Sequence, residues 1–211
     1  MTTVKGKAPN RRAEKARETR TRMLDAAREL FVAQGYGATT LADVAKAAGV
    51  AVQTIYFTFN NKRSLLKELV DVTIAGDDEP VATMDRQWFR DAVAAPTAVE
   101  HLRGQVAGSR AVLDRIAPIM SMVGVAAASD PEVAAIWPRD VDPRFTVLST
   151  SALSLVDKPG ARSGVSAAEA ADRLYGILSP ELYLVFVRDR GWSPERYEQW
   201  AFETLRQQLC A

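Results

Sequence analysis

The sequence has almost none of the residues from which disulfide frameworks, metal sites and acid–base sites are built. Its 211 residues include one cysteine, Cys210, and one histidine, His101. A single cysteine cannot form a disulfide within the chain, which excludes a disulfide-stapled scaffold. The sequence has no His/Cys/Asp cluster at metal-ligand spacing and no glycine-rich phosphate loop. We therefore predict no metal, no cofactor and no enzymatic activity, and an all-α enzyme is the weakest alternative.

Long hydrophobic runs and β-type alternation are also missing. The basic residues at the start are not followed by the apolar stretch of a secretory signal, and no apolar run reaches the roughly 18 residues of a membrane helix. These absences predict a soluble, cytoplasmic protein that has no membrane partner. Apolar residues instead recur with the helical period of 3.6 residues along the chain. The expected fold class is all-α.

The net charge of +1 hides an uneven distribution of charged residues. Residues 1–62 contain eleven Lys or Arg and five Asp or Glu, whereas residues 63–211 contain 16 and 21. A basic first third beside an acidic remainder suits a protein that contacts nucleic-acid phosphates with one end only. A solvated charged surface without a partner is the alternative.

Two short helical patterns meet at Gly49, between Thr39 and Lys62. Thr40, with Asp43 three residues later, resembles a capping box, which satisfies free backbone N–H groups at a helix start. Gly49 allows a tight turn because it adopts positive φ without a Cβ clash. The first helix carries an apolar stripe at i, i+3, i+4 and i+7, formed by Leu41, Val44, Ala45 and Ala48.

The second short helix is expected from about Ala51. Ile55 and Phe59 would point inward, and Gln53, Thr54 and Phe57 would point outward. This layout predicts a helix-turn-helix that seats its second helix in the DNA major groove. A surface helical hairpin that only packs on a core is the alternative.

The chain divides into three expected segments. Residues 1–18 have few large apolar side chains and predict a flexible basic arm, whose Arg11, Arg12 and Arg17 approach DNA unless the arm only aids solubility. Residues 19–62 form the helix-turn-helix domain, with its first helix over 19–34. Residues 63–211 form a helical ligand-binding and dimerisation domain. Its helices are expected over residues 81–94, 97–123, 130–137 and 145–155, followed by two more.

A ligand pocket and a dimer interface are expected in the larger domain. Aromatic and methionine side chains would line the pocket around His101 or Arg110 as the polar anchor, although such residues also build ordinary cores. The last two helices carry broad apolar stripes that either cover the chain's own core or pair with a second subunit; we favour a homodimer. The expected pocket residues are Trp88, His101, Arg110, Met120, Met122, Trp137 and Phe145. The expected interface residues are Leu174, Tyr175, Leu178, Leu182, Tyr197, Trp200 and Leu205.

The stretch from about Thr19 to Val70 resembles the DNA-binding domain of TetR-type transcriptional regulators. The resemblance covers about a quarter of the chain. It rests on Ala27, Leu30, Phe31, Gly35, Tyr36, Thr39, Thr40, Ala45, Ala48, Gly49, Val50, Thr54, Ile55, Tyr56, Phe59, Lys62, Leu65 and Leu66.

The resemblance implies an all-α homodimer that represses transcription from a palindromic operator on double-stranded DNA. A small-molecule effector, apolar or aromatic if methionines line the pocket, would release it. The implied DNA contacts are Thr39, Thr40, Val50, Ala51, Val52, Gln53, Thr54, Tyr56, Phe57 and Lys62. An architectural DNA-binding protein without an effector is the alternative, and repressor and activator are not distinguished.

The sequence departs from the family within the second helix of the motif. Ala51 stands where the family usually has a capping Ser or Thr, so the helix is expected to lack a side-chain N-cap. Gln53 replaces a frequent Gly, Phe57 a polar residue and Thr58 an aromatic one. These changes leave the expected fold intact and put any operator sequence borrowed from the family in doubt.

Overall fold

The structure, a computed structural model, describes residues 11–77, 81–136 and 142–211. These residues form helices and no strands, apart from one isolated bridge between Ala161 and Cys210. The expected all-α class is confirmed. The chain divides into two compact units, Met1–Leu69 and Val70–Ala211.

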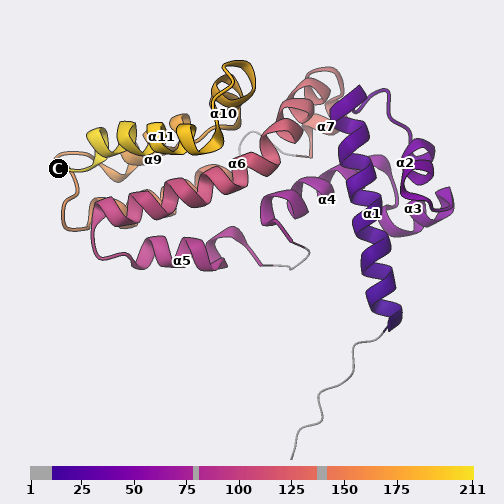
Figure 1. The fold of residues 1–211 in the computed structure, drawn as a ribbon, viewed down its shortest axis with the longest axis horizontal. Coiled ribbons are helices and arrows are strands. Elements are labelled where there is room, and N and C mark those ends of the chain that lie inside the picture. The colour runs from indigo at the N-terminus through magenta and orange to yellow at the C-terminus, as the bar shows by residue number, and fades with distance from the viewer. Residues whose placement is uncertain (1–10, 78–80, 137–141) are drawn as a thin grey trace, which may run out of the picture. The chain divides into compact units, whose positions relative to one another are not determined.

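Four helices build the first unit (Figure 1). Helix α1 packs on α2, and α2 packs on α3. Met23, Leu24 and Phe31 of α1 are fully buried because they lie on the apolar stripe of that helix. The helices are α1 (Arg11–Gln34), α2 (Leu41–Ala48), α3 (Val52–Phe59) and the start of α4 (Lys62–Ala75).

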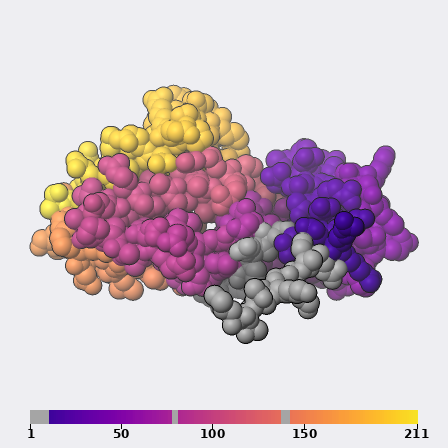
Figure 2. Space-filling model, turned by 60° about the horizontal axis from the view of Figure 1, so that its bottom comes forward, coloured from indigo at the N-terminus to yellow at the C-terminus, as the bar shows by residue number. Residues whose placement is uncertain are grey.

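Helix α1 begins at Arg11, earlier than expected, so residues 11–18 are helical and the prediction of a flexible arm is wrong for them. The stretch has little to bury, but Ala, Arg, Glu and Lys are strong helix formers, and the packed part of α1 supplies the costly first turn. The side chains from Arg11 to Glu18 are exposed, and Figure 2 shows the start of α1 in dark indigo at the surface. Residues 1–10 of the expected arm lie outside the described residues.

The caps of the two short helices follow the sequence signals. The Thr40 hydroxyl accepts a hydrogen bond from the Asp43 N–H (3.1 Å), and Oδ2 of Asp43 accepts one from the Thr40 N–H (2.9 Å), which completes the predicted capping box. Gly49 ends α2 with φ of 67°. Ala51 precedes α3 without a side-chain cap, as predicted.

The first unit extends further than the sequence indicated. We expected it to end at Lys62, whereas the division falls between Leu69 and Val70, within α4. Leu65, Leu66 and Leu69 are almost fully buried and belong to the first unit, because one face of α4 supplies part of its core.

The second unit is organised around its longest helix, α6 (Ala98–Ser129). Helices α5, α10 and α11 pack on α6 (Figure 1), and α8 packs on α9. The other elements are a 3₁₀ turn (Thr83–Asp85), α5 (Gln87–Ala94), α7 (Pro131–Ala134), α8 (Pro143–Val156), α9 (Ala167–Ile177), α10 (Pro180–Leu184), a π-helical turn (Val185–Asp189) and α11 (Pro194–Leu209).

Three helix lengths in this unit differ from the sequence expectation. The helix expected over 130–137 is the short α7, which ends at Ala134. The helix expected over 81–94 is replaced by the 3₁₀ turn and the shorter α5, with Arg86 extended between them. Helix α6 continues beyond Val123 to Ser129, where Asp130 begins the next turn.

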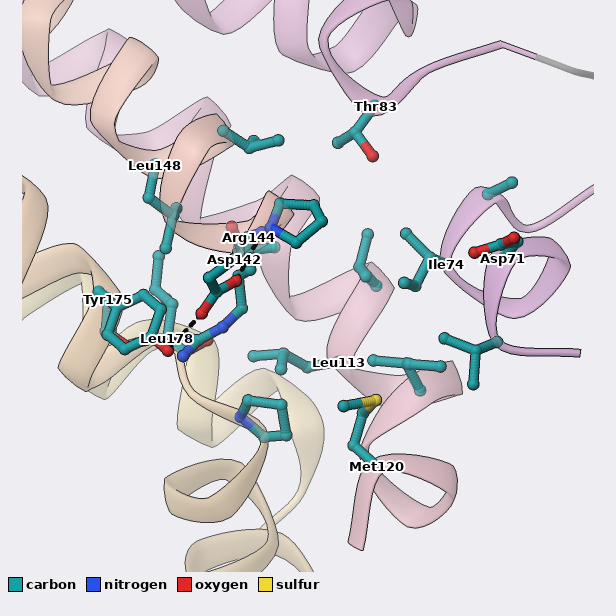
Figure 3. A pocket seen from close by; sticks show the side chains of 18 of the residues that line it. Asp71, Ile74, Thr83, Leu113, Met120, Asp142, Arg144, Leu148, Tyr175 and Leu178 are labelled. Carbon is teal, nitrogen blue, oxygen red and sulfur yellow. Dashed lines mark hydrogen bonds between the residues drawn. The ribbon is translucent and has the colours of Figure 1, made fainter. Parts of the chain in front are cut away.

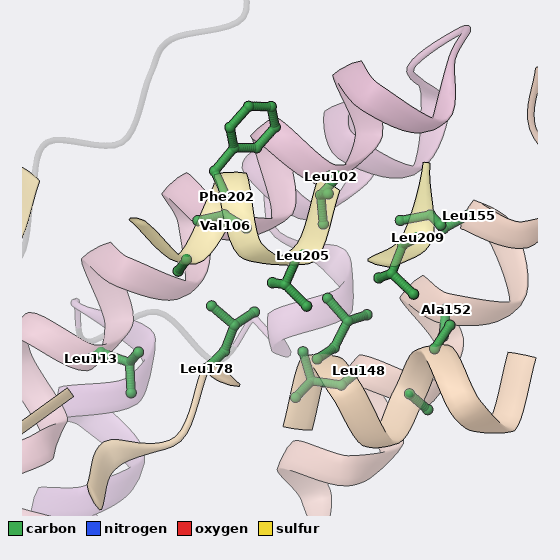
Figure 4. Close-up of a cluster of buried hydrophobic side chains, with 14 of the residues drawn as sticks. Leu102, Val106, Leu113, Leu148, Ala152, Leu155, Leu178, Phe202, Leu205 and Leu209 are labelled. Atoms are coloured by element: carbon green, nitrogen blue, oxygen red, sulfur yellow. The ribbon is translucent and has the colours of Figure 1, made fainter. Parts of the chain in front are cut away.

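The core of the second unit is formed by apolar side chains from α6, α8, α9, α10 and α11 (Figure 4). Four of the residues that we expected at a dimer interface belong to this core instead. Leu174, Leu178, Tyr197 and Leu205 are at most 2% exposed within one chain, and they cover this core. Their spacing marks a buried face, and periodicity cannot tell whether the same chain or a second one buries it.

Among the described residues, α6 is long and apolar enough, by length and composition alone, to cross a membrane. The expectation that no segment reaches that size is therefore corrected. The core helices of soluble proteins pass the same test. Here Leu102, Val106 and Leu113 of α6 are buried against other helices of the unit.

Candidate DNA-binding face and ligand cavity

Helix α3 presents a mixed aromatic and polar face on the first unit. Phe57 is 94% exposed and Tyr56 is 54% exposed, and Gln53 is also exposed. Ile55 and Phe59 are buried, which confirms the inward face predicted from the sequence. A nearly fully exposed phenylalanine has no packing role among the residues that the structure describes. The outer face of α3 is therefore available to a partner.

The other residues expected at DNA surround this helix, with one correction. Thr40 and Ala51 are exposed, and Val50, Val52 and Thr54 are half-buried. Thr39 is buried, and its hydroxyl donates to the Gly35 carbonyl (2.9 Å) and accepts from Gln34 Nε2 (3.2 Å). The sequence pattern could not reveal that these hydrogen bonds hold Thr39 against the turn after α1. It does not belong to the exposed surface.

Lys62 lies at the start of α4 with its ammonium packed on an aromatic ring. The Nζ atom is 4.1 Å from the centroid of the Tyr36 ring and donates to the Gly37 carbonyl at 3.5 Å. This cation–π contact fixes the lysine stem against the turn after α1. The positive charge is thereby held close to the exposed helix-turn-helix motif.

The second unit contains a cavity of about 750 Å³, a size within the range of small-molecule sites (Figure 3). Apolar residues predominate in its lining: Val70, Ile74, Ala75, Val81, Ala82, Trp88, Val112, Leu113, Ile116, Met120, Pro143, Val147, Leu148, Leu178 and Pro180. The polar lining residues are Asp71, Thr83, Gln105, Ser109, Asp142, Arg144, Tyr175 and Glu181.

Two of the residues expected in the pocket, Trp88 and Met120, line this cavity. Two other apolar candidates do not. Met122 is buried on another face of α6, and Phe145 is 40% exposed with its ring against Tyr175 (5.5 Å between centroids).

Arg110 does not act as the polar anchor of the cavity. Its guanidinium donates to Glu198 and to Asp114 at 2.9 Å each, and these bonds raise its pKa. It therefore ties α6 to α11. Trp137, another expected pocket residue, lies outside the described residues.

His101 also lies away from the cavity, in a fully buried position between α6 and α8. Its Nε2 is 2.8 Å from the hydroxyl oxygen of Ser151. Burial, assisted by the positive charge of Lys158, lowers the pKa of His101 from 6.5 to about 4. The imidazole is therefore neutral at neutral pH, and it packs in the core instead of anchoring a ligand.

This depressed pKa predicts a loss of stability on acidification. The unfolded chain binds a proton at His101 near pH 6.5 and the folded chain only near pH 4, so the stabilisation is complete above pH 6.5 and is lost as the pH falls toward 4. Between pH 7 and pH 4.5 we expect the free energy of unfolding to drop by about 2 kcal/mol through this residue. Denaturant unfolding of wild type and His101→Gln measures the difference.

The chain has one histidine, so NMR titration of its imidazole gives an independent check. An imidazole pKa near 6.5 in the folded protein would contradict the prediction. An equal loss of stability in wild type and His101→Gln between pH 7 and pH 4.5 would also contradict the prediction.

The sequence reasoning missed the polar lining of the cavity. Asp142 caps α8 by accepting the N–H of Arg144 (2.9 Å), and it accepts the Tyr175 hydroxyl (2.5 Å), which raises the pKa of that phenol. The Arg144 guanidinium lies 3.5 Å from the Tyr175 ring centroid and donates to the Tyr175 carbonyl (2.9 Å). The expected helix began at residue 145, whereas α8 begins at Pro143 with Asp142 as its cap. The partner of Asp142, Tyr175, lies 33 residues away, and no local signal points to it.

Gln105 and Ser109 were also missed, although the sequence carried a signal for them. They are spaced four residues apart on the inner face of α6, where most other residues are apolar. Polar residues on a buried helix face either pair with each other or serve a partner.

The two short helices, the positive-φ turn between them and the exposed outer face of α3 define the class of helix-turn-helix DNA-binding proteins. A sequence profile of bacterial regulatory proteins of the tetR family matches residues 23–69. The HTH-type transcriptional regulator TtgR of Pseudomonas putida is 46% identical over 61 residues, which make up 29% of each chain. A second regulator of that species, TtgW, is 38% identical over 90 residues, or 41% of this chain and 67% of TtgW.

Solved structures extend the likeness to nearly the whole chain. FadR from Bacillus subtilis, in complex with stearoyl-CoA, superposes with a TM-score of 0.67 at 19% identity, covering 88% of this chain and 96% of FadR. A regulator from Saccharomonospora viridis, in complex with choline, has a TM-score of 0.67 at 19% identity and covers 92% and 98%. At these identities the likeness shows a shared fold.

The chain belongs to the TetR family of transcriptional regulators. The members of this family that it matches are regulators and not enzymes. The chain spans less than a third of the length of TtgR in their match, and the family profile covers residues 23–69, within the first unit.

Proposed function

We propose that the protein is a homodimeric repressor that binds an inverted-repeat operator and is released by a mainly apolar small molecule. The observation that carries the proposal is the face of α3, where Phe57 is almost fully exposed beside Gln53 and Tyr56. An amide of this kind pairs bidentately with adenine, and an aromatic edge contacts the methyl group of thymine. Such a face is suited to reading base edges in the major groove.

The surroundings of α3 support a phosphate-binding role. Lys62 and the hydroxyl of Tyr56 are suited to contacts with DNA phosphates, which would hold α3 in register with the base pairs. The exposed start of α1 adds Arg11, Arg12 and Lys15 to the positive charge of the first unit. Residues 11–18 would thus contact DNA as a basic helix.

The effector part of the proposal rests on the cavity of the second unit. Its volume and mostly apolar lining are those of small-molecule sites. A purely architectural DNA-binding protein has no use for such a cavity in its larger unit.

The dimer part rests on the apolar side chains that the second unit leaves partly uncovered. Of the residues expected at the interface, Leu182 and Trp200 are half-buried, and the neighbouring Val185 is 45% exposed. A single helix-turn-helix reads few base pairs, so two-fold pairing through this face would double the half-sites.

Sequencing the fragments that the full-length protein selects from random DNA tests the proposal. We expect an inverted repeat whose affinity falls steeply with salt. The slope of the logarithm of the binding constant against the logarithm of the salt concentration should be about −0.9 for each phosphate contacted. Screening small molecules for release of the selected DNA then tests the effector. A single unrepeated site bound by a monomer would refute the dimer. Sequence-independent binding that no small molecule relieves would favour the architectural alternative.

A further inference from the structure

We propose that the effector carries a hydroxyl or N–H group on its apolar body, and that this group donates a hydrogen bond to Oε1 of Gln105. The inference rests on the proposed function of the cavity and specifies the chemistry of its ligand. Gln105 is 1% exposed and lines the cavity. It is a buried polar residue in the lining of the cavity.

One end of the Gln105 amide is satisfied by the protein and the other is not. Its Nε2 donates to the Ser109 hydroxyl at 2.9 Å, one helical turn further along α6. Its Oε1 accepts no hydrogen bond from any residue that the structure describes. A buried acceptor without a partner costs free energy, so natural sequences retain one where something else supplies the donor. A ligand donor in the cavity satisfies this requirement.

The charges around the cavity select the kind of donor. Three carboxylate residues and one guanidinium line it: Asp71, Asp142, Glu181 and Arg144. The guanidinium of Arg144 is stacked on Tyr175 and donates to the carbonyls of Tyr175 (2.9 Å) and Leu178 (3.4 Å). A ligand carboxylate would meet mostly like charge. We therefore expect neutral or cationic donors, such as alcohols, phenols and amines, and no anionic effectors.

Matched probes of three shapes test the inference on the full chain. Each apolar body is used in three forms: with a hydroxyl, as the methyl ether, and with a carboxylate. The three sets are 4-hexylphenol, 4-hexylanisole and 4-hexylbenzoate; 4-phenylphenol, 4-methoxybiphenyl and biphenyl-4-carboxylate; and 1-decanol, 1-methoxydecane and decanoate. Calorimetry gives the dissociation constants. For the shapes that bind, we expect the hydroxyl member to bind about 10-fold more tightly than its methyl ether. The carboxylate should bind most weakly.

Two variants separate the role of the Gln105 amide from general packing. Gln105→Met keeps the volume of the side chain without its acceptor, and the preference for the hydroxyl probe should shrink to within about twofold. Met120→Leu alters the apolar lining alone and should keep the preference. Circular dichroism and urea unfolding of both variants show whether they are folded.

The outcomes distinguish this inference from the proposed function. Equal binding of the hydroxyl and ether members refutes the role of Gln105 and leaves the cavity as an effector site. Tighter binding of the ethers, or of the carboxylates, refutes the chemistry proposed. If no probe of any shape binds although the protein binds its DNA, the inference falls together with the proposed effector role of the cavity.

Discussion

Replacing Gln53 with alanine is expected to weaken binding to the selected operator by about 10-fold or more and to relax base preference at one position of each half-site. A bidentate contact between an amide and a base contributes roughly 1–3 kcal/mol of discrimination. Gln53 is exposed on α3 and alanine is a strong helix former, so the fold should be unaffected. Fluorescence anisotropy with operator variants at fixed salt measures both effects.

Controls separate base reading from phosphate contact. Tyr56→Phe and Lys62→Ala should weaken binding on all sequences alike and leave the base preference unchanged. Gln207→Ala makes the same chemical change at an exposed position of α11 and should leave DNA binding as it is. If Gln53→Ala loses affinity without any change in preference, the placement of the reading face on α3 is wrong.

Replacing Leu205 with alanine is expected to lower the free energy of unfolding by about 2–5 kcal/mol. Leu205 is fully buried in the core of the second unit, and truncation removes its packing and leaves a cavity. Urea unfolding followed by circular dichroism measures the loss. The exposed Gln207, two residues further along the same helix, gives a matched control, since Gln207→Ala should change the stability by at most about 0.5 kcal/mol.

The same variant distinguishes core from dimer interface. If Leu205 covers its own core, the difference from wild type is the same at every protein concentration and the association state is unchanged. If it lay between subunits, Leu205→Ala would weaken association, and the difference would depend on concentration. The second result would restore the interface that the sequence pattern suggested.

Local signals explain why the helix-turn-helix could be predicted. The capping box of Thr40 and Asp43 spans three residues, and the turn at Gly49 depends on one backbone conformation. The inward positions of Ile55 and Phe59 follow from one turn of helix. Each feature is decided within a few residues, so neighbouring sequence is sufficient.

The cavity and the supposed interface could not be predicted in the same way. Leu174, Tyr197 and Leu205 follow a helical stripe whether they face their own chain or a second one. His101 and Arg110 were plausible anchors, but their true partners, Ser151 and Glu198, lie far along the sequence. Only the packing of the helices selects among such pairings.

Local sequence features are sufficient for the helical class, the family and the outward face of α3, because helical periodicity, caps and a positive-φ glycine are local properties. Tertiary packing decides the burial of Thr39 and the burial of Gln105 at the cavity wall. These depend on which surfaces meet across long separations, and a one-dimensional pattern records only that a face is apolar, not what covers it.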